Sequence, residues 1–463
     1  MEQNNYEEGL VGRTWKEISQ PFKDLFHTSR ALFGLNLSYL IEGFTYFGVL
    51  GYLTLYFNEY VGLNDINAGQ MVGVLTAGIT LSMLFLGATV DWIGLRKAMI
   101  YSLLFMLAGR ILISVAPNIG VPGLWNSGHI FAMFGILGVV IGYGIYMPAC
   151  YAGVKKLTTE KTSAMGYAML YALMNLGGFL PGIVAPGIRQ STSMLAVMWI
   201  YAIFTAVGIF VVYFIITKKA YTKAIEEAGV DKKDSGKEDD DELSKMNFNE
   251  KLRFYIKNFP LRDLRFLFFI FILIPVQTLF AHNWLTLPAY FKRAFEGTVS
   301  NYFEFFTNFN PVLIFILTPM VTALTSKKDT YKMMIIGTFV MASPTFFLAT
   351  GPSLTAVFAY LIIMSIGEAM WQPRFLQWVA EIAPKNMTGI YMGIGQFPWF
   401  LTKIITSLYS GWFLMNYCPD KTIPSQMNTG TMWLIYGFIA IITPIGLLLA
   451  RKWMIKGFKT KHG

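Results

Sequence analysis

Five ionisable side chains stand inside long apolar runs of this sequence. Glu42 lies within the run from about Phe33 to Phe57, which is long enough to cross a bilayer because a spanning helix needs about 20 apolar residues. A carboxylate at the centre of such a helix costs about 3 kcal/mol or more unless it lines a polar cavity. The other four are Glu368, Arg110, Arg374 and Lys403. Together they indicate a pathway for a solute or a proton through a helical bundle.

The composition is that of a membrane protein. Of the 463 residues, 54% are hydrophobic and only 14% are charged, whereas soluble domains carry about 25% charged residues. Twelve apolar runs are candidate spans, centred near Glu42, Thr76, Leu107, Leu137, Leu173, Phe204, Val276, Ile314, Met341, Met364, Phe400 and Ala440. The sequence therefore predicts an all-α membrane protein with twelve transmembrane helices.

Membrane topology explains the net charge of +10 better than nucleic-acid binding does. If the N-terminus is cytoplasmic, most of the 37 Lys and Arg residues fall in cytoplasmic segments. The outer loops then contain only Arg189, Lys292, Arg293 and Lys421. Because Lys and Arg concentrate on the cytoplasmic side, we expect a multi-pass protein of the plasma membrane with both termini cytoplasmic. Its surroundings are the lipid bilayer, and no nucleic-acid partner is expected.

One charged segment divides the chain. It contains KKDSGKEDDDELSK, a composition that cannot bury a core. Six candidate spans precede it and six follow, as in transporters built from two pseudo-symmetric six-helix halves. We expect an N-terminal six-helix bundle over residues 1–217, a cytoplasmic linker over 218–263, and a C-terminal six-helix bundle with a cytoplasmic tail over 264–463.

The loop after the second span reads GATVDWIGLRK and resembles the loop signature of the major facilitator superfamily. The matching positions are Gly87, Asp91, Gly94, Arg96 and Lys97. The glycines permit a tight turn between two helices, and Asp91 can pair with a basic group to form a latch. The resemblance implies that these residues take part in gating. An ordinary basic cytoplasmic loop is the alternative.

Further motifs resemble one family of that superfamily, the proton-dependent oligopeptide transporters. They are EGFTYFG (42–48), GYGIYMP (142–148), YALMNLGG (171–178), NPVLIFILTP (310–319), GEAMWQP (367–373) and EIAPKNMTGIYMG (381–393). Their order along the chain, rather than any single motif, carries the resemblance. It implies the major facilitator fold and proton-driven peptide transport by alternating access.

The chain departs from that family at positions assigned to proton coupling and to the peptide carboxylate. Tyr39 and Gly43 stand where the family has a carboxylate and an arginine, and Met147 replaces a lysine. The acidic residue of the seventh span is absent, with Gln277 and His282 nearby. These departures leave the cargo and the coupling route open.

Helical spacing places the candidate binding and coupling residues on shared faces. These candidates are Tyr39, Glu42, Tyr46, Tyr146, Tyr171, Asn175, Gln277, His282, Glu368, Trp371, Gln396, Trp399 and Lys403. Aromatic rings with polar tips suit a half-wet cavity, although helix packing is the alternative for any one of them. Lys403 is expected either to bind an anionic group of the substrate or to pair with Glu368. Arg110 is expected to be structural, and His282 to be a hydrogen-bonded neutral histidine, with a proton carrier as the alternative.

The leading interpretation is a secondary active transporter that couples protons to short peptides or a similar small zwitterionic solute. A sugar, a nucleoside or an organic anion is the alternative cargo. A non-transporting substrate sensor is the alternative of another class. We do not expect an enzyme, because the sequence has no phosphate loop or nucleophile–base constellation and no Cys/His cluster with metal-ligand spacing. We expect a small-molecule substrate and no cofactor besides the coupling proton; the sequence is compatible with a monomer.

Overall fold

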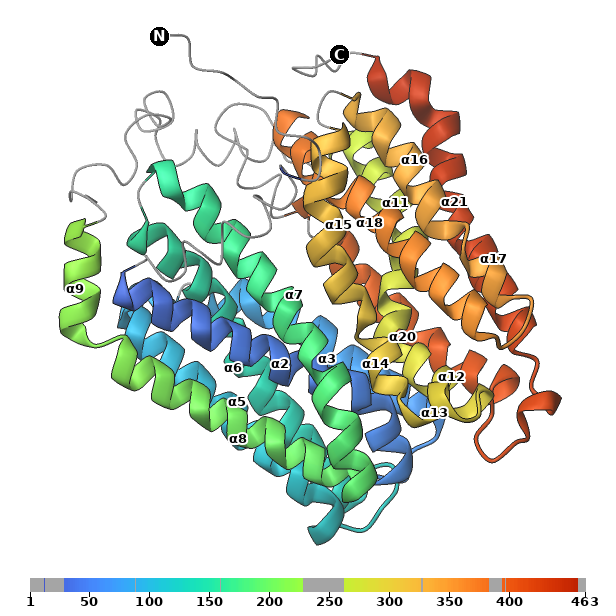
Figure 1. The fold of residues 1–463 in the computed structure, drawn as a ribbon, viewed down its shortest axis with the longest axis horizontal. Coiled ribbons are helices and arrows are strands. Elements are labelled where there is room, and N and C mark those ends of the chain that lie inside the picture. The colour runs from blue at the N-terminus through green and yellow to red at the C-terminus, as the bar shows by residue number, and fades with distance from the viewer. Residues whose placement is uncertain are drawn as a thin grey trace. The chain divides into compact units, whose positions relative to one another are not determined.

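The computed structural model describes residues 29–87, 89–158, 160–227, 262–325, 328–382 and 397–456, with Gly12 and residues 394–395 besides (Figure 1). Within these ranges every regular element is a helix. A lipid bilayer offers no water to backbone amides, so a spanning segment must satisfy its own hydrogen bonds, as a helix does.

The chain as far as Glu227 forms one series of helices. They are α2 (Arg30–Glu59), α3 (Asp65–Leu86), α4 (Thr89–Ile93), α5 (Leu95–Ile119), α6 (Ser127–Leu157), α7 (Glu160–Ser191), α8 (Met194–Ile215) and α9 (Lys218–Glu227). Ser29 caps α2, because its hydroxyl accepts a hydrogen bond from the Leu32 N–H at 3.3 Å. Such a cap satisfies one of the free N–H groups of the first turn. The rest of the predicted linker, up to residue 261, lies outside the described residues.

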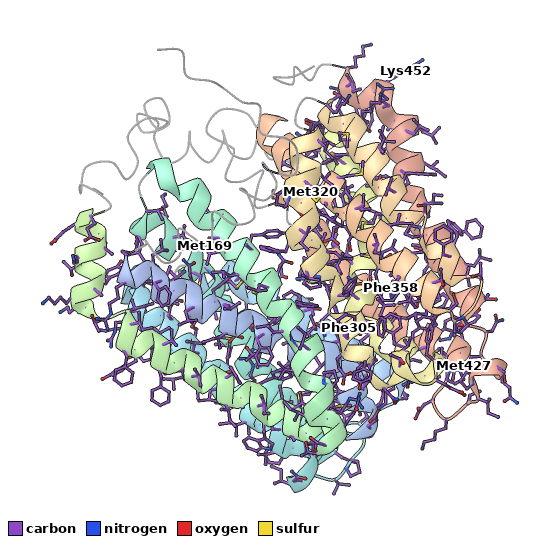
Figure 2. All side chains as sticks on the ribbon, viewed as in Figure 1. Met169, Phe305, Met320, Phe358, Met427 and Lys452 are labelled. Carbon is purple, nitrogen blue, oxygen red and sulfur yellow. The ribbon has the colours of Figure 1, made fainter. Side chains whose placement is uncertain are left out.

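A second series follows from Asp263. It comprises α11 (Leu264–Leu285), α12 (Leu287–Ala294), α13 (Thr298–Asn301), α14 (Phe303–Thr307), α15 (Phe309–Thr325), α16 (Thr330–Ala342), α17 (Thr345–Leu348), α18 (Leu354–Ile382), α20 (Phe397–Tyr417), the 3-10 helix η2 (Pro424–Gln426) and α21 (Thr429–Ile455). Asp263 caps α11, since its carboxylate accepts a hydrogen bond from the Arg265 N–H at 2.9 Å. Lys452 lies in the last turn of α21, at the end that leads to the C-terminus (Figure 2).

Among the described residues, eleven segments are long and apolar enough to cross a membrane. They coincide with eleven of the predicted spans. The remaining prediction, centred near Phe400, falls on α20, which has 21 residues and is less apolar because polar side chains and Lys403 interrupt it. The predicted all-α membrane fold is confirmed, with a helix at each of the twelve predicted positions.

The helices pack into two compact units. The first comprises Met1–Asn64, Gly78–Gly229 and Glu296–Ser326, and the second comprises Asp65–Ala77, Val230–Phe295 and Lys327–Gly463. In the first unit α2 packs on α7 and α8, α5 packs on α6 and α8, and α14 and α15 pack on α7. In the second, α11 packs on α20 and α21, and α16 packs on α18. The division of the sequence at residues 217 and 264 stays a prediction.

Two motifs of the sequence, GYGIYMP on α6 and GEAMWQP on α18, share a glycine, an aromatic residue and a proline at the same spacing. In both, the glycine faces the preceding long helix. A Cβ on Gly142 would lie 2.7 Å from the Ser102 carbonyl oxygen of α5, and one on Gly367 would lie 2.2 Å from the Met341 nitrogen of α16. Neither position has room for a side chain, so the two motifs form equivalent close helix contacts in the two units.

Candidate functional site

Glu42 on α2 and Arg110 on α5 form a buried ion pair in the first unit. Their side chains are only 1% and 2% exposed. Arg110 Nη1 donates to Glu42 Oε2 at 3.0 Å, and Nη2 donates to Oε1. Two parallel N–H···O bonds give the strong bidentate arrangement of arginine with a carboxylate. Each side chain therefore compensates the charge of the other.

Hydroxyl groups from two more helices complete this cluster. The Tyr143 hydroxyl of α6 donates to Glu42 Oε1 and accepts from Arg110 Nη2 at 3.5 Å. Arg110 Nη1 also donates to Thr205 Oγ1 of α8. The Thr205 hydroxyl donates in turn to the Tyr201 carbonyl at 2.8 Å. Four helices, α2, α5, α6 and α8, thus meet at this ion pair.

The ion pair makes the burial of each side chain depend on the other. Removing one partner of a buried pair leaves an uncompensated charge and costs about 3–5 kcal/mol, whereas replacing both partners by neutral groups is often tolerated. The two charges of this pair therefore depend on each other for their burial.

Sequence reasoning identified Glu42 as a candidate but did not pair it with Arg110. Sixty-eight residues separate the two, and helical periodicity does not say which spans adjoin. The sequence indicated such a pair only by placing an acidic residue and a basic residue in different spans. Thr205 carried no comparable signal, because a threonine in a membrane helix is ordinary.

The predicted tyrosines of α2 and α6 lie beside the ion pair. The Tyr46 ring contacts the Tyr143 ring, with centroids 5.0 Å apart. The Tyr146 hydroxyl shares a hydrogen bond of 2.8 Å with Ser38 Oγ, and its ring stacks on Tyr39 with centroids 6.2 Å apart. These rings join α2 to α6 on the side of α2 that carries Glu42.

Two further candidates of the first unit stand on α7. Asn175 Nδ2 donates to the Tyr171 carbonyl at 2.9 Å, so this amide hydrogen-bonds within its own helix. The Tyr171 side chain is 47% exposed. Figure 2 labels Met169 on the same helix, whose sulfur accepts a hydrogen bond from Asn36 Nδ2 at 3.7 Å. The side chains of α7 before Gly166 lie outside the described residues.

The loop motif of the first unit includes a glycine in a left-handed conformation. Gly94 has φ of 82° and precedes α5, a conformation that costs glycine little. Arg96 Nη2 donates to the Tyr213 carbonyl at 3.1 Å, and its guanidinium lies 4.9 Å from the Tyr213 ring centroid. It therefore joins α5 to the end of α8. The Gly87 N–H donates to the Met83 carbonyl, and Lys97 is exposed.

The proposed latch at Asp91 stays a prediction, because its side chain lies outside the described residues. The same holds for Gln396, which falls in the gap before α20.

In the second unit, α20 brings Thr402, the residue before the candidate Lys403, to the candidate Gln277 of α11. Thr402 Oγ1 donates to Gln277 Oε1 at 3.2 Å, and both side chains are buried. The adjacent Lys403 Nζ donates to the Thr76 carbonyl of α3 at 3.5 Å. Gly73, on the preceding turn of α3, would place a Cβ only 2.1 Å from Ser407 Oγ, so α3 and α20 are in close contact near Lys403.

An aromatic group links α11, α18 and α20 in this unit. The Trp399 ring meets the Phe280 ring edge-on at 5.4 Å and runs nearly parallel to the Trp371 ring at 6.4 Å. Trp371 is fully buried, and its Nε1 donates to the Met341 sulfur at 3.1 Å. One turn before, Glu368 accepts a hydrogen bond from Gln372 Nε2 at 3.1 Å. The predicted face of α18 therefore lies next to the predicted face of α20.

His282 is fully buried in a polar aromatic cluster of the second unit. Its Nδ1 lies 2.7 Å from Thr286 Oγ1 and its Nε2 lies 3.2 Å from the Tyr409 hydroxyl. Its ring stacks on the Tyr436 ring with centroids 3.9 Å apart. Both ring nitrogens thus have hydrogen-bond partners, as expected of a structural histidine.

Two further ion pairs, one half-buried and one buried, were missed by sequence reasoning. In the first unit, Arg189 of α7 binds Glu304 of α14, which also accepts a hydrogen bond from Tyr52. In the second, Arg293 of α12 binds Asp65 of α3. The four charged residues are near helix ends, where sequence patterns do not separate an ion pair from ordinary loop charges. Among the described residues, no group of three or more His, Cys, Asp or Glu could hold a metal ion.

The fold and these buried charges define a class, that of a multi-pass, all-helical membrane transporter. The chain belongs to the Major Facilitator Superfamily, whose family profile matches residues 35–407. This assignment agrees with the loop signature in the sequence.

Solved structures of peptide transporters share the fold. A mutant of the peptide transporter POT in complex with alafosfalin has a TM-score of 0.68 and 18% identity, over 93% of this chain and 96% of that one. A POT family transporter in complex with 5-aminolevulinic acid has a TM-score of 0.66 and 16% identity, over 92% and 97%.

A curated relative matches over a shorter stretch. Polyol transporter 5 of Arabidopsis thaliana is 28% identical over 106 residues, which is 22% of this chain and 18% of that protein. The match therefore spans less than a fifth of the relative's length.

Proposed function

We propose that this protein is a proton-coupled symporter of short peptides or a similar small zwitterionic solute, working by alternating access. We further propose that it resides in the plasma membrane with both termini cytoplasmic, as the distribution of Lys and Arg favours. The coupling ion is the proton, and Glu42 is the group that carries it.

The buried ion pair of Glu42 with Arg110 carries this proposal. A carboxylate 1% exposed in a spanning helix is retained at a considerable cost in stability unless it has a function. Its hydrogen-bond partners and those of Arg110 come from three other helices, so a change in its charge reaches all of them. That is the property that a coupling residue requires.

The cargo is proposed from fold and chemistry together. One of the similar structures is a complex with 5-aminolevulinic acid, a molecule with one amino and one carboxyl group. In the second unit, Lys403 and Glu368 offer one charge of each sign, which suits a zwitterionic solute.

A second candidate cargo is a neutral sugar or polyol. Its specific support is the match to a polyol transporter, together with neutral hydroxyl groups on the face of α2 and α6. In the first unit the charge of Glu42 is taken up by Arg110, so the tyrosines beside it offer hydrogen bonds without a net charge.

The experiment is transport by purified protein in proteoliposomes, with radiolabelled alanyl-alanine as the probe. An inward proton gradient should drive accumulation, and a protonophore should abolish it. Glu42→Gln should lose accumulation and keep exchange of the dipeptide between the two sides. Glu59→Gln is the matched control, because Glu59 is an exposed carboxylate at the end of the same helix, and it should behave as the wild type.

Two results would contradict the proposal. Accumulation that survives the protonophore, or that is unchanged in Glu42→Gln, would remove the coupling role. If a sugar alcohol such as sorbitol is accumulated and alanyl-alanine is not, the polyol interpretation replaces the peptide interpretation.

A further inference from the structure

We propose that the first unit binds the headgroup of an anionic phospholipid where α8 ends. The site is a basic corner, formed by Arg30, Arg96, Lys218 and Lys219 around the last turn of α8. It lies on the proposed cytoplasmic side of the membrane. The inference does not depend on which solute is transported or on whether transport is coupled to protons.

Two arginines from different helices meet at the last turn of α8. Arg30, the first residue of α2, donates from Nη2 to the Phe214 carbonyl at 3.1 Å. Arg96, near the start of α5, donates from Nη2 to the Tyr213 carbonyl at 3.1 Å. Because the two acceptors belong to consecutive residues, the two guanidinium groups lie close together. A guanidinium has five N–H donors, so binding one carbonyl leaves donors for a further ligand.

Helix α9 adds two more cations to the basic corner. The chain leaves α8 at Ile215 and α9 begins at Lys218, where the Thr217 hydroxyl accepts a hydrogen bond from the Ala220 N–H at 3.2 Å. Lys218 and Lys219 are both exposed. Helix α9 packs on α2 and α6, and Figure 1 shows that it turns away from the axis of α8. Its cations therefore lie at the membrane surface rather than within the span.

The N-termini of three helices lie at the basic corner. Arg30, Arg96 and Lys218 are in the first turns of α2, α5 and α9, and none of these turns contains an acidic residue. A helix N-terminus favours anions and disfavours cations. At the start of α5, the N-cap residue Gly94 also has no side chain to satisfy the first N–H groups. This arrangement is unfavourable by itself and becomes favourable when an anion binds.

No described carboxylate forms an ion pair with the four cations of the basic corner. The two carbonyls of α8 carry only partial negative charge. The described carboxylates of α9 are Glu226 and Glu227 at its opposite end, and Glu227 pairs with Lys223 at 3.5 Å. The corner thus has an excess of positive charge that a phosphate group would complement.

The outer face of α8 leads into the basic corner, which favours a phospholipid over a free phosphate ion. Exposed apolar side chains follow this face at helical spacing, at Ile203, Val207, Phe210 and Phe214. The Phe210 and Phe214 rings stack with centroids 6.2 Å apart. Tyr213 is also exposed, and its polar tip suits the membrane–water interface. One lipid can therefore place its acyl chains along α8 and its phosphate at the arginines.

The excess positive charge selects a headgroup with a net negative charge. Arginine binds phosphate through two N–H donors at once, whereas lysine acts as a point charge. A zwitterionic headgroup brings its own ammonium group, which the four cations repel. Each basic residue near a membrane surface is worth about a fivefold change in affinity for anionic lipid. Phosphatidylglycerol therefore fits the corner better than phosphatidylcholine.

Titration of the purified full-length protein with single lipids, followed by native mass spectrometry, tests the proposal. Phosphatidylglycerol should bind about tenfold more tightly than phosphatidylcholine with the same acyl chains. Glycerol 3-phosphate offers a phosphate group without acyl chains. In excess over the lipid, it should not displace phosphatidylglycerol.

Variants of the four cations locate the site. Arg30→Gln/Arg96→Gln should weaken phosphatidylglycerol binding by about tenfold or more and leave phosphatidylcholine binding unchanged. Arg30→Lys/Arg96→Lys keeps both charges and should lose less. Lys218→Gln/Lys219→Gln changes two exposed side chains and should also weaken binding about tenfold. If the arginine variant does not fold, the lysine variant still decides.

The matched control is Arg451→Gln/Lys452→Gln, which removes two exposed cations near the end of α21 in the second unit. It should bind phosphatidylglycerol as the wild type does. An equal loss in this control would mean that the lipid responds to net charge rather than to a site, and would overturn the proposal. So would equal affinities for the two lipids, or unchanged binding in Lys218→Gln/Lys219→Gln. Displacement by glycerol 3-phosphate would assign the corner to a free phosphate compound instead of a lipid.

Discussion

Arg293 and Asp65 are joined by two parallel hydrogen bonds, from Nη1 to Oδ2 at 2.7 Å and from Nη2 to Oδ1 at 2.8 Å. The two side chains are only 5% and 8% exposed. Arg293 Nη1 also donates to the Cys418 carbonyl at 3.1 Å, where α20 ends. One guanidinium therefore ties together α12, the first turn of α3 and the end of α20.

Breaking this pair should destabilise the protein. Asp65→Asn leaves the Arg293 charge buried, and the expected loss is about 3–5 kcal/mol. Thermal unfolding in detergent measures it. The matched control is Lys223→Gln, which breaks the exposed pair with Glu227 on α9, 3.5 Å long, and should cost about 0.5 kcal/mol or less.

The contribution of Arg293 to the stability of the protein should not depend on pH between pH 6 and pH 9. Burial lowers the pKa of Arg293, but its hydrogen bonds and charge contact with Asp65 raise it more, so the net direction is upward. A group whose pKa is raised on folding stabilises at every pH below its unfolded value and loses that effect only above it. Arg293 should therefore contribute equally to the free energy of unfolding at pH 6 and at pH 9. A difference in unfolding temperature between the wild type and an Arg293 variant that changes between these pH values would contradict this account.

Gly43 should not tolerate a side chain. A Cβ there would lie 2.9 Å from the Met174 carbonyl oxygen of α7, so Gly43→Ala must push two backbones apart, at a cost of about 1–3 kcal/mol. Gly187, on α7, has no atom within 4 Å of the position that a Cβ would occupy. Gly187→Ala should be neutral or stabilising by up to about 1 kcal/mol. Equal unfolding temperatures for the two variants would show that the contact at Gly43 is not tight.

The two native cysteines should be unreactive in the folded protein. Both Cys150 and Cys418 are fully buried, and burial raises the pKa of the Cys418 thiol to about 12. Only the thiolate reacts readily, so a maleimide at neutral pH should label neither cysteine until the protein unfolds. Labelling of the native protein, measured by intact mass, would contradict this.

If neither native cysteine reacts, the wild type can serve as the background for cysteine labelling that tests the membrane topology. A cysteine introduced at Thr298, which is exposed, should react with a membrane-impermeant maleimide added to intact cells. A cysteine at Ser235, in the predicted linker, should react only after the cells are opened. The reverse pattern would overturn the proposed orientation.

Lys403 is predicted to bind the anionic end of the cargo. Amidation of the C-terminus of a bound dipeptide should weaken binding by about tenfold, the value of one charge-assisted hydrogen bond. Lys403→Ala should abolish this penalty and leave the penalty for N-acetylation unchanged. Affinities from thermal shifts of the purified protein measure both. A C-amidation penalty that survives in Lys403→Ala would place the carboxylate elsewhere.

The sequence by itself determined the membrane fold. Apolar runs of sufficient length, interrupted by charged loops, predict spans because the cost of burying a charge or a free amide in lipid is local to each segment. The helix α11 begins at Leu264, directly after the capping Asp263, although the sequence marks this boundary less sharply than the others. The same local cost marks Glu42 as an unusual residue within its span.

Only the tertiary structure decided which charges meet. The partner of Glu42 is Arg110, and that of Asp65 is Arg293, 228 residues away in the sequence. Spacing along one helix gives the face on which a side chain lies, but the helix that this face meets depends on the packing of all the spans. Small contacts such as Gly43 on Met174 and Gly109 on Gly135 set that packing, and their fit is a property of paired surfaces that no single segment contains.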